Sequence, residues 1–187
     1  PRVGRAYRAG RYEVDDAADQ TYHRATANME WQPREKLRVE VAAGGEKRKY
    51  SAGSSVTPVL EGRVDWTPSE KTNFYLNAYR RELASAFPVG QNYRLTGVSA
   101  GVSHKLNDKW SAHLEAGFER AAYRQVDGTE AADAGTDRLW FVRPSIEYRF
   151  TEQPGLEIFY RVASNDSNRA GFGYDQQTAG VLLDYKF

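Results

Sequence analysis

Hydrophobic and polar residues alternate along most of this chain with a period of two. Around residue 100 the even positions carry Val98, Ala100 and Val102, whereas the odd positions carry glycine and serine. The alternation resumes at Trp110, after the short polar segment 107–109. Side chains of a β-strand point to opposite faces in turn, so this pattern predicts two strands with one apolar and one polar face, joined by a tight turn.

The same hairpin unit recurs along the whole chain, with short and long connections in alternation. Short polar turns are predicted at 32–36, 67–71, 107–109 and 151–155, and longer segments rich in Gly, Ser, Asp and Ala at about 15–20, 50–55, 84–91, 126–136 and 164–172. This order predicts an all-β antiparallel meander whose two ends differ. We expect about ten strands, at 3–14, 21–32, 36–49, 56–67, 72–83, 92–106, 109–125, 138–151, 155–164 and 173–187.

The two faces of these strands differ in charge. Apolar sets such as Leu156, Ile158 and Tyr160 contain no charged residue, and only strand 3–14 fails to show a distinct face. The charges fall on the opposite parity, which would line the interior of a barrel. The expected lumen-lining residues are Arg38, Glu40, Glu61, Arg63, Asp65, Glu115, Arg143, Glu147, Arg149, Glu157 and Arg161.

These charged residues form ladders of both signs on neighbouring strands, for example Arg38 with Glu40 and Glu157 with Arg161. Such pairs stabilise a wall in either of two barrel sizes. In a barrel of only ten strands the long side chains would fill most of the interior, whereas a larger barrel would leave water inside. The near balance of signs predicts weak ion selectivity in both cases.

Aromatic residues lie beside the short turns. An amphipathic ring prefers the headgroup level of a bilayer, so this placement is typical of an aromatic girdle at a membrane interface. The members of this predicted girdle are Trp31, Trp66, Phe74, Trp110, Phe150 and Phe187.

Composition alone would suggest a soluble domain, because the mean hydropathy is −0.73 and 27% of the residues are charged. The same alternation would fit a soluble β-sandwich whose apolar face points inward. Strand length, the aromatic residues beside the short turns, and an apolar face of small residues favour the membrane. No run approaches the roughly 20 apolar residues of a membrane helix. The last strand, which ends in the aromatic residue Phe187, resembles the C-terminal signature strand of bacterial outer-membrane barrels.

Charge and composition exclude several classes of function. The 26 basic and 25 acidic residues leave no net field to attract nucleic acid, and the absence of cysteine removes disulfides and thiolate metal sites. We expect no metal site and no cofactor.

Two groups of residues are candidates for catalysis. Ser111, His113 and Glu115 share one face, but neighbours two residues apart on a strand lie about 6 to 7 Å apart, too far for a triad. Asp15 and Asp16 near His23 resemble the acidic pair and histidine of the omptin proteases. Adjacent acids in a loop are more often simply solvated, so we predict that the protein is not an enzyme.

Three stretches carry a resemblance to a known family. WTPSEKTNFYLNAYRREL (66–83), YRLTGVSAGVSHKLNDKWSAHLEAGFERAAY (93–123) and SNDSNRAGFGYDQQTAGVLLDYKF (164–187) resemble the beta-barrel porin type 2 family of outer-membrane barrels, often encoded with exopolysaccharide loci. The resemblance covers about residues 20–187 and consists of turn and strand patterns. Family members are usually longer, so 1–187 is either a small single barrel domain or the C-terminal part of a larger barrel.

The resemblance implies a location in the bacterial outer membrane and a role as a passive channel or export-associated conduit, with polysaccharide as the solute. A structural or scaffolding barrel of an envelope complex, without an open pore, stays open as the alternative. The expected partners are outer-membrane lipid, lipopolysaccharide and subunits of an envelope complex.

Overall fold

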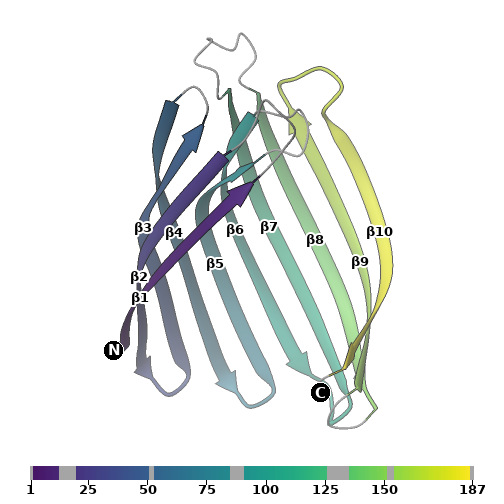
Figure 1. Ribbon diagram of the computed structural model, residues 1–187. Coiled ribbons are helices and arrows are strands. Elements are labelled where there is room, and N and C mark those ends of the chain that lie inside the picture. The colour runs from purple at the N-terminus through teal and green to yellow at the C-terminus, as the bar shows by residue number, and fades with distance from the viewer. Residues whose placement is uncertain are drawn as a thin grey trace.

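The computed structural model describes residues 2–12, 20–50, 53–84, 91–125, 135–150 and 154–185. These residues form ten antiparallel strands in one meander sheet, in which each strand pairs with its neighbours in sequence (Figure 1). The strands are β1 (Arg2–Tyr12), β2 (Gln20–Arg34), β3 (Leu37–Tyr50), β4 (Gly53–Ser69), β5 (Thr72–Ala84), β6 (Gln91–Lys105), β7 (Trp110–Gln125), β8 (Thr136–Arg149), β9 (Pro154–Ser167) and β10 (Tyr174–Tyr185). The predicted all-β meander is confirmed. A helix long and apolar enough to cross a membrane is not found in these ranges.

The short turns gather at one end of the sheet, at the bottom of Figure 1. The β2–β3 ladder closes with Arg34 opposite Leu37, and the β4–β5 ladder with Ser69 opposite Thr72. Between β6 and β7, Asn107 Oδ1 accepts hydrogen bonds from the backbone N–H groups of Lys109 and Trp110, both at 2.9 Å. We call this end the turn end and the opposite end the loop end.

Several strands are longer than predicted. Residues 50–55 do not form a long loop, because Tyr50 ends β3 and pairs with Gly53 at the start of β4. Residues 164–167 belong to β9. The strands also continue through Arg34 and Ser69, with register shifts after Trp31 and Trp66. Pro33 and Pro68 lie within these shifts, and a proline cannot donate to a regular ladder.

The sheet is curled but not closed. Within the described ranges, β1 pairs only with β2, and β10 pairs only with β9. The strands follow a curved surface, as Figure 1 shows, and side chains from β1 to β8 line one shared cavity. The face that carries this cavity is therefore the inner, concave face.

Burial is reversed relative to a water-soluble domain. Large apolar side chains on the outer face are about half exposed, including Leu60, Trp66 and Ile158. Polar side chains such as Glu46 and Thr57 are buried on the inner side. A continuous exposed apolar surface around a polar interior matches a sheet surrounded by lipid.

Candidate functional site

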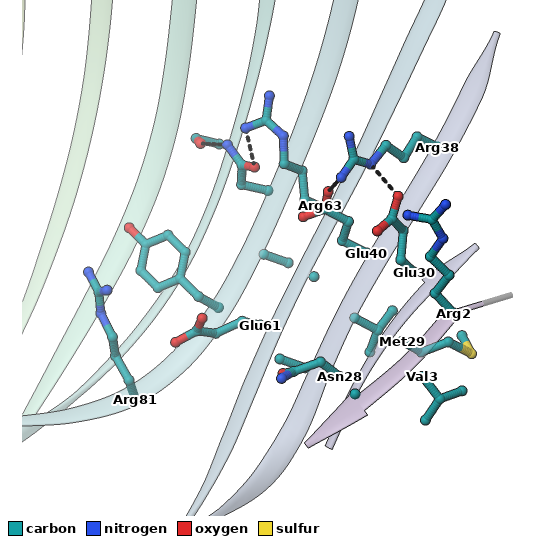
Figure 2. Close-up of a pocket in the computed structure, with 18 of the residues that line it drawn as sticks. Arg2, Val3, Asn28, Met29, Glu30, Arg38, Glu40, Glu61, Arg63 and Arg81 are labelled. Carbon is teal, nitrogen blue, oxygen red and sulfur yellow. Dashed lines mark hydrogen bonds and ion pairs between the residues drawn. The ribbon is translucent and has the colours of Figure 1, made fainter. Parts of the chain in front are cut away.

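The inner face forms an open cavity of about 870 Å³ that is lined mainly by polar and charged side chains (Figure 2). Because side chains alternate along each strand, every second residue points to the inner face, and part of these residues line the cavity. The inner-face residues that line it are Arg2, Gly4, Asn28, Glu30, Arg38, Glu40, Ala42, Glu61, Arg63, Asn77, Tyr79, Arg81, Ser99, Glu115, Glu119 and Phe141.

Ion pairs hold the part of the cavity that lies on β2 to β4. Arg38 bridges Glu30 at 3.2 Å and Glu40 at 2.7 Å (Figure 2). Arg63 binds Asp65 in a bidentate fashion, with two N–O distances of 2.7 Å. Each of these arginines is fixed by hydrogen bonds to a carboxylate, so their charges are compensated locally.

Two tyrosines of β5 lie flat across glycines of β6. A Cβ atom added to Gly97 would lie 2.6 Å from Tyr79 Cζ, and one added to Gly101 would overlap the Tyr75 ring. Since Gly97 has no side chain, Tyr79 reaches over β6 and donates a hydrogen bond to Glu119 on β7. Glycine is required on β6 here because of this close approach.

The same arrangement recurs on the inner face of β7 to β10. Phe141 of β8 covers Gly117 of β7, and Phe159 of β9 covers Gly180 of β10. A guanidinium lies over each of the four rings, at 4.5 to 5.0 Å from the ring centroid. The pairs are Arg63 with Tyr75, Arg81 with Tyr79, Arg143 with Phe159 and Arg161 with Phe141. As cation–π pairs, these stacks of glycine, aromatic ring and arginine contribute about 0.5 to 2 kcal/mol each.

A buried ion cluster lies near the loop end, where β4 stops pairing with β5 beyond Leu60. Glu46 is completely buried and binds both Arg24, at 2.7 Å, and Arg48. Arg48 also donates to the Glu82 carbonyl at 2.8 Å, and Thr57 donates to the Glu82 carboxylate. Side chains therefore join β3, β4 and β5 where the backbone ladder is interrupted. We call these five residues the loop-end ion cluster.

A chain of polar contacts crosses β6, β7 and β8 near the turn end. The imidazole Nδ1 of His113 lies 2.8 Å from Ser103 Oγ, and its Nε2 lies 3.4 Å from a Glu147 carboxylate oxygen. The partners of His113 are therefore a serine of β6 and a glutamate of β8. They are not Ser111 and Glu115, its neighbours on β7. These contacts join β6, β7 and β8 through their side chains.

The structure places the predicted lumen-lining residues on the inner parity of β3, β4, β7, β8 and β9. Some predicted partners meet, as Arg38 does with Glu40 and Arg149 with Glu147. Glu157, however, binds Arg143 at 3.0 Å, whereas Arg161 stacks on Phe141. The pair of Glu157 and Arg143 joins β9 to β8, which is the kind of cross-strand pairing expected of these ladders.

The predicted girdle residues within the described ranges are all exposed. Trp66 stacks on Phe74 across β4 and β5, with centroids 5.3 Å apart. Tyr148 joins Trp110 and Phe150, at 4.7 and 5.0 Å. Trp31 is also exposed, and Phe187 lies outside the described residues. Their role at a membrane interface stays a prediction.

The alternation pattern missed the four inner aromatic rings as functional residues. Tyr75, Tyr79, Phe141 and Phe159 stand on the charged parity of their strands, which was the available signal.

Fold and site together define a β-sheet protein that is apolar outside and polar inside, as the wall of an outer-membrane channel is. Residues 8–187 match the model of the family described as "Putative beta-barrel porin 2". The chain belongs to this family, and its place is the bacterial outer membrane. No sequence among the curated proteins matches it significantly.

Two solved outer-membrane proteins share the fold. A loop-deletion mutant of OmpT, an outer membrane protein of Vibrio cholerae, aligns with a TM-score of 0.57 at 12% identity, over 97% of this chain and 62% of that one. The copper transporter OprC aligns with a TM-score of 0.57 at 10% identity, over 97% and 37%. The porin NanC aligns at 0.49 and 9% identity, over 99% and 94%. This chain thus spans less than two thirds of the length of the first two proteins.

Proposed function

We propose that this chain forms the wall of a passive channel for hydrophilic solutes in the bacterial outer membrane. The observation that carries the proposal is the polar cavity of about 870 Å³ on the inner face, behind an outer face of exposed apolar side chains. Family membership supports a channel role. Water and polar solutes would cross on the inner side, and lipid would contact the outer side.

Conduction requires a closed wall. A row of unpaired backbone groups in the hydrocarbon region costs several kcal/mol per group, so β1 and β10 need partners there. Three arrangements would supply them: pairing of β1 with β10, further strands of the same polypeptide, or strands of other chains. The first would give a narrow interior largely filled by the side chains described above, and the other two a wider one.

For the solute we propose a polysaccharide or a related polyhydroxylated compound, as an export-associated conduit would carry. The cavity offers both donors and acceptors, from Asn28, Asn77 and Ser99 among others, and sugar hydroxyl groups need both. The likeness to barrels encoded with exopolysaccharide loci also favours this solute.

Planar-bilayer recording of the purified protein, refolded in detergent, tests the channel. We expect discrete conductance steps, and addition of an oligosaccharide series should reduce the current in a length-dependent way. A protein that is folded by circular dichroism but gives no steps would refute the channel. Steps that no oligosaccharide alters would refute the polysaccharide and leave the channel standing.

A scaffolding barrel without an open pore is the second candidate. The loop-end ion cluster favours it, because Glu46, Arg48 and Thr57 fill the inner side of β3 and β4 with buried side chains. In that case the bilayer recording gives no steps, and the protein is recovered from membranes in complex with other envelope subunits.

An omptin-like protease is the least supported candidate. His23 is exposed on β2, on the outer parity, and Asp15 and Asp16 lie outside the described residues. Peptide hydrolysis by the wild-type protein that is lost in both Asp16→Ala and His23→Ala variants would revive it.

A further inference from the structure

Three arginines form a row across the outer face near the loop end. Arg80 of β5 is opposite Thr96 of β6, which is opposite Arg120 of β7, which in turn is opposite Arg138 of β8. All three arginines stand on the outer parity, the same parity as the exposed apolar side chains. We call these three residues the arginine row.

The arginine row lies one step beyond an apolar row. Two residues closer to the turn end, Val98, Phe118 and Trp140 are opposite one another on β6, β7 and β8. These three side chains are 43 to 48% exposed on the outer face. A tryptophan next to cationic side chains marks the level at which hydrocarbon meets lipid headgroups.

The cations of this row make no ion pair within the described part of the chain. No carboxylate there forms an ion pair with Arg80, Arg120 or Arg138, although exposed Asp166 is opposite Arg138 on β9. Arg80 Nε is buried and lacks a hydrogen-bond partner among the same residues. By contrast, most inner-face arginines bind a carboxylate or stack on a ring.

Direct opposition of Arg120 and Arg138 is unfavourable unless an anion lies between them. Like charges directly across a strand pair destabilise a sheet. The two backbones are about 5 Å apart, so both guanidinium groups can bind the same phosphate group. Arg80, about 10 Å further along the row, is within reach of a second phosphate of the same molecule.

We propose that the arginine row binds the phosphate groups of the glycolipid in the outer leaflet, lipopolysaccharide. Long connections of outer-membrane barrels face the outside of the cell, so the loop end lies in that leaflet. Arginine is suited to phosphate because its planar fork donates two parallel hydrogen bonds. Acyl chains of the same lipid would lie against the row of Val98, Phe118 and Trp140. This inference concerns the lipid side of the wall and does not depend on whether the barrel conducts.

The test measures retention of lipopolysaccharide by the full chain, purified in detergent, by native mass spectrometry and by titration. The test variant is the triple substitution Arg80→Gln, Arg120→Gln and Arg138→Gln. The matched control is Arg34→Gln, Lys71→Gln and Lys109→Gln, which removes three exposed cations at the turn end. A cation near an anionic membrane surface strengthens binding roughly fivefold, so the row should contribute about 100-fold.

We expect about 100-fold weaker binding for the arginine-row variant and wild-type binding for the control. Lipopolysaccharide stripped of its phosphates should bind wild-type protein as weakly as the intact lipid binds the variant. Equal binding of intact and stripped lipid, or an unaffected triple variant, would overturn the proposal. If millimolar inorganic phosphate fully displaces lipopolysaccharide, the arginine row binds soluble anions, and the proposal is overturned as well. Heat stability in lipid-free detergent shows that the variant is folded, and it should equal or exceed that of the wild type because like charges are removed.

Discussion

Tyr79 on β5 donates a hydrogen bond to Glu119 on β7, across the whole width of β6. This contact exists because Gly97 presents only backbone beneath the ring. Arg81 covers the other side of the ring, 5.0 Å from its centroid. The position of two charged groups in the cavity thus depends on one missing side chain, and this dependence can be tested.

Alanine at Gly97 or Gly101 should narrow the cavity. The new methyl group would displace Tyr79 or Tyr75 from the wall, together with the arginine stacked on it, at a cost of about 1 to 3 kcal/mol in folding. If the protein conducts, each variant should show a smaller single-channel conductance. Gly62→Ala is the control, because its Cβ would meet nothing closer than 3.9 Å. Identical conductance in all three variants would contradict this prediction.

Removing only the Tyr79 hydroxyl should weaken the β5–β7 contact and leave the ring in place. We expect Tyr79→Phe to lower the free energy of unfolding by about 1 kcal/mol, measured by urea denaturation in detergent. Tyr160→Phe serves for comparison, since Tyr160 donates to Gln177 on the exposed outer face. The decrease in the free energy of unfolding should be smaller for Tyr160→Phe, because water or detergent headgroups can replace an exposed partner.

Loss of one carboxylate should destabilise the protein far more in the loop-end ion cluster than in an exposed ion pair. Glu46→Gln leaves Arg24 and Arg48 without their shared carboxylate, and removal of one partner from a buried pair costs about 3 to 5 kcal/mol. Glu40→Gln removes a pair in which both side chains are over 40% exposed, which should cost about 1 kcal/mol or less. Thermal or urea unfolding of the two variants side by side would show the difference, and equal losses would argue against a special role for the cluster.

Arg169 should hold the connection between β9 and β10 in place. Its guanidinium lies between the rings of Tyr123 and Phe172, 4.1 and 4.0 Å from their centroids, and 3.6 Å from Asp137. Arg169→Ala should therefore increase cleavage of residues 168–173 by thermolysin severalfold. Arg149→Ala, at the turn end, should leave that cleavage rate unchanged. An unchanged rate in both variants would mean that other contacts are sufficient to hold the segment.

Much of the fold could be predicted because alternation alone determines which side chains share a face. The parity of Leu156 and Ile158 identified the outer surface without any knowledge of partners. Contacts across strands required the register, which depends on local events such as the shift after Trp66. For this reason the sequence did not show that Glu157 binds Arg143, or that Tyr79 reaches Glu119.

The arginine row was missed for a simpler reason. On β5 the uncharged residues of the outer parity end at Ala78, and the next residue of the same parity is Arg80. One more step on β7 and β8 reaches Arg120 and Arg138. Charges at the end of an apolar parity are thus a usable sequence signal, provided that the neighbouring strands are aligned first.

The two free edges of the sheet have a consequence for biogenesis. Until β1 and β10 find partners, each offers a row of backbone donors and acceptors that any extended peptide can join. A copy whose edges are unpaired would therefore aggregate and be cleaved by periplasmic proteases. A copy whose edges are paired would resist both aggregation and cleavage. Edge closure would then act as a checkpoint that separates finished molecules from those destined for degradation.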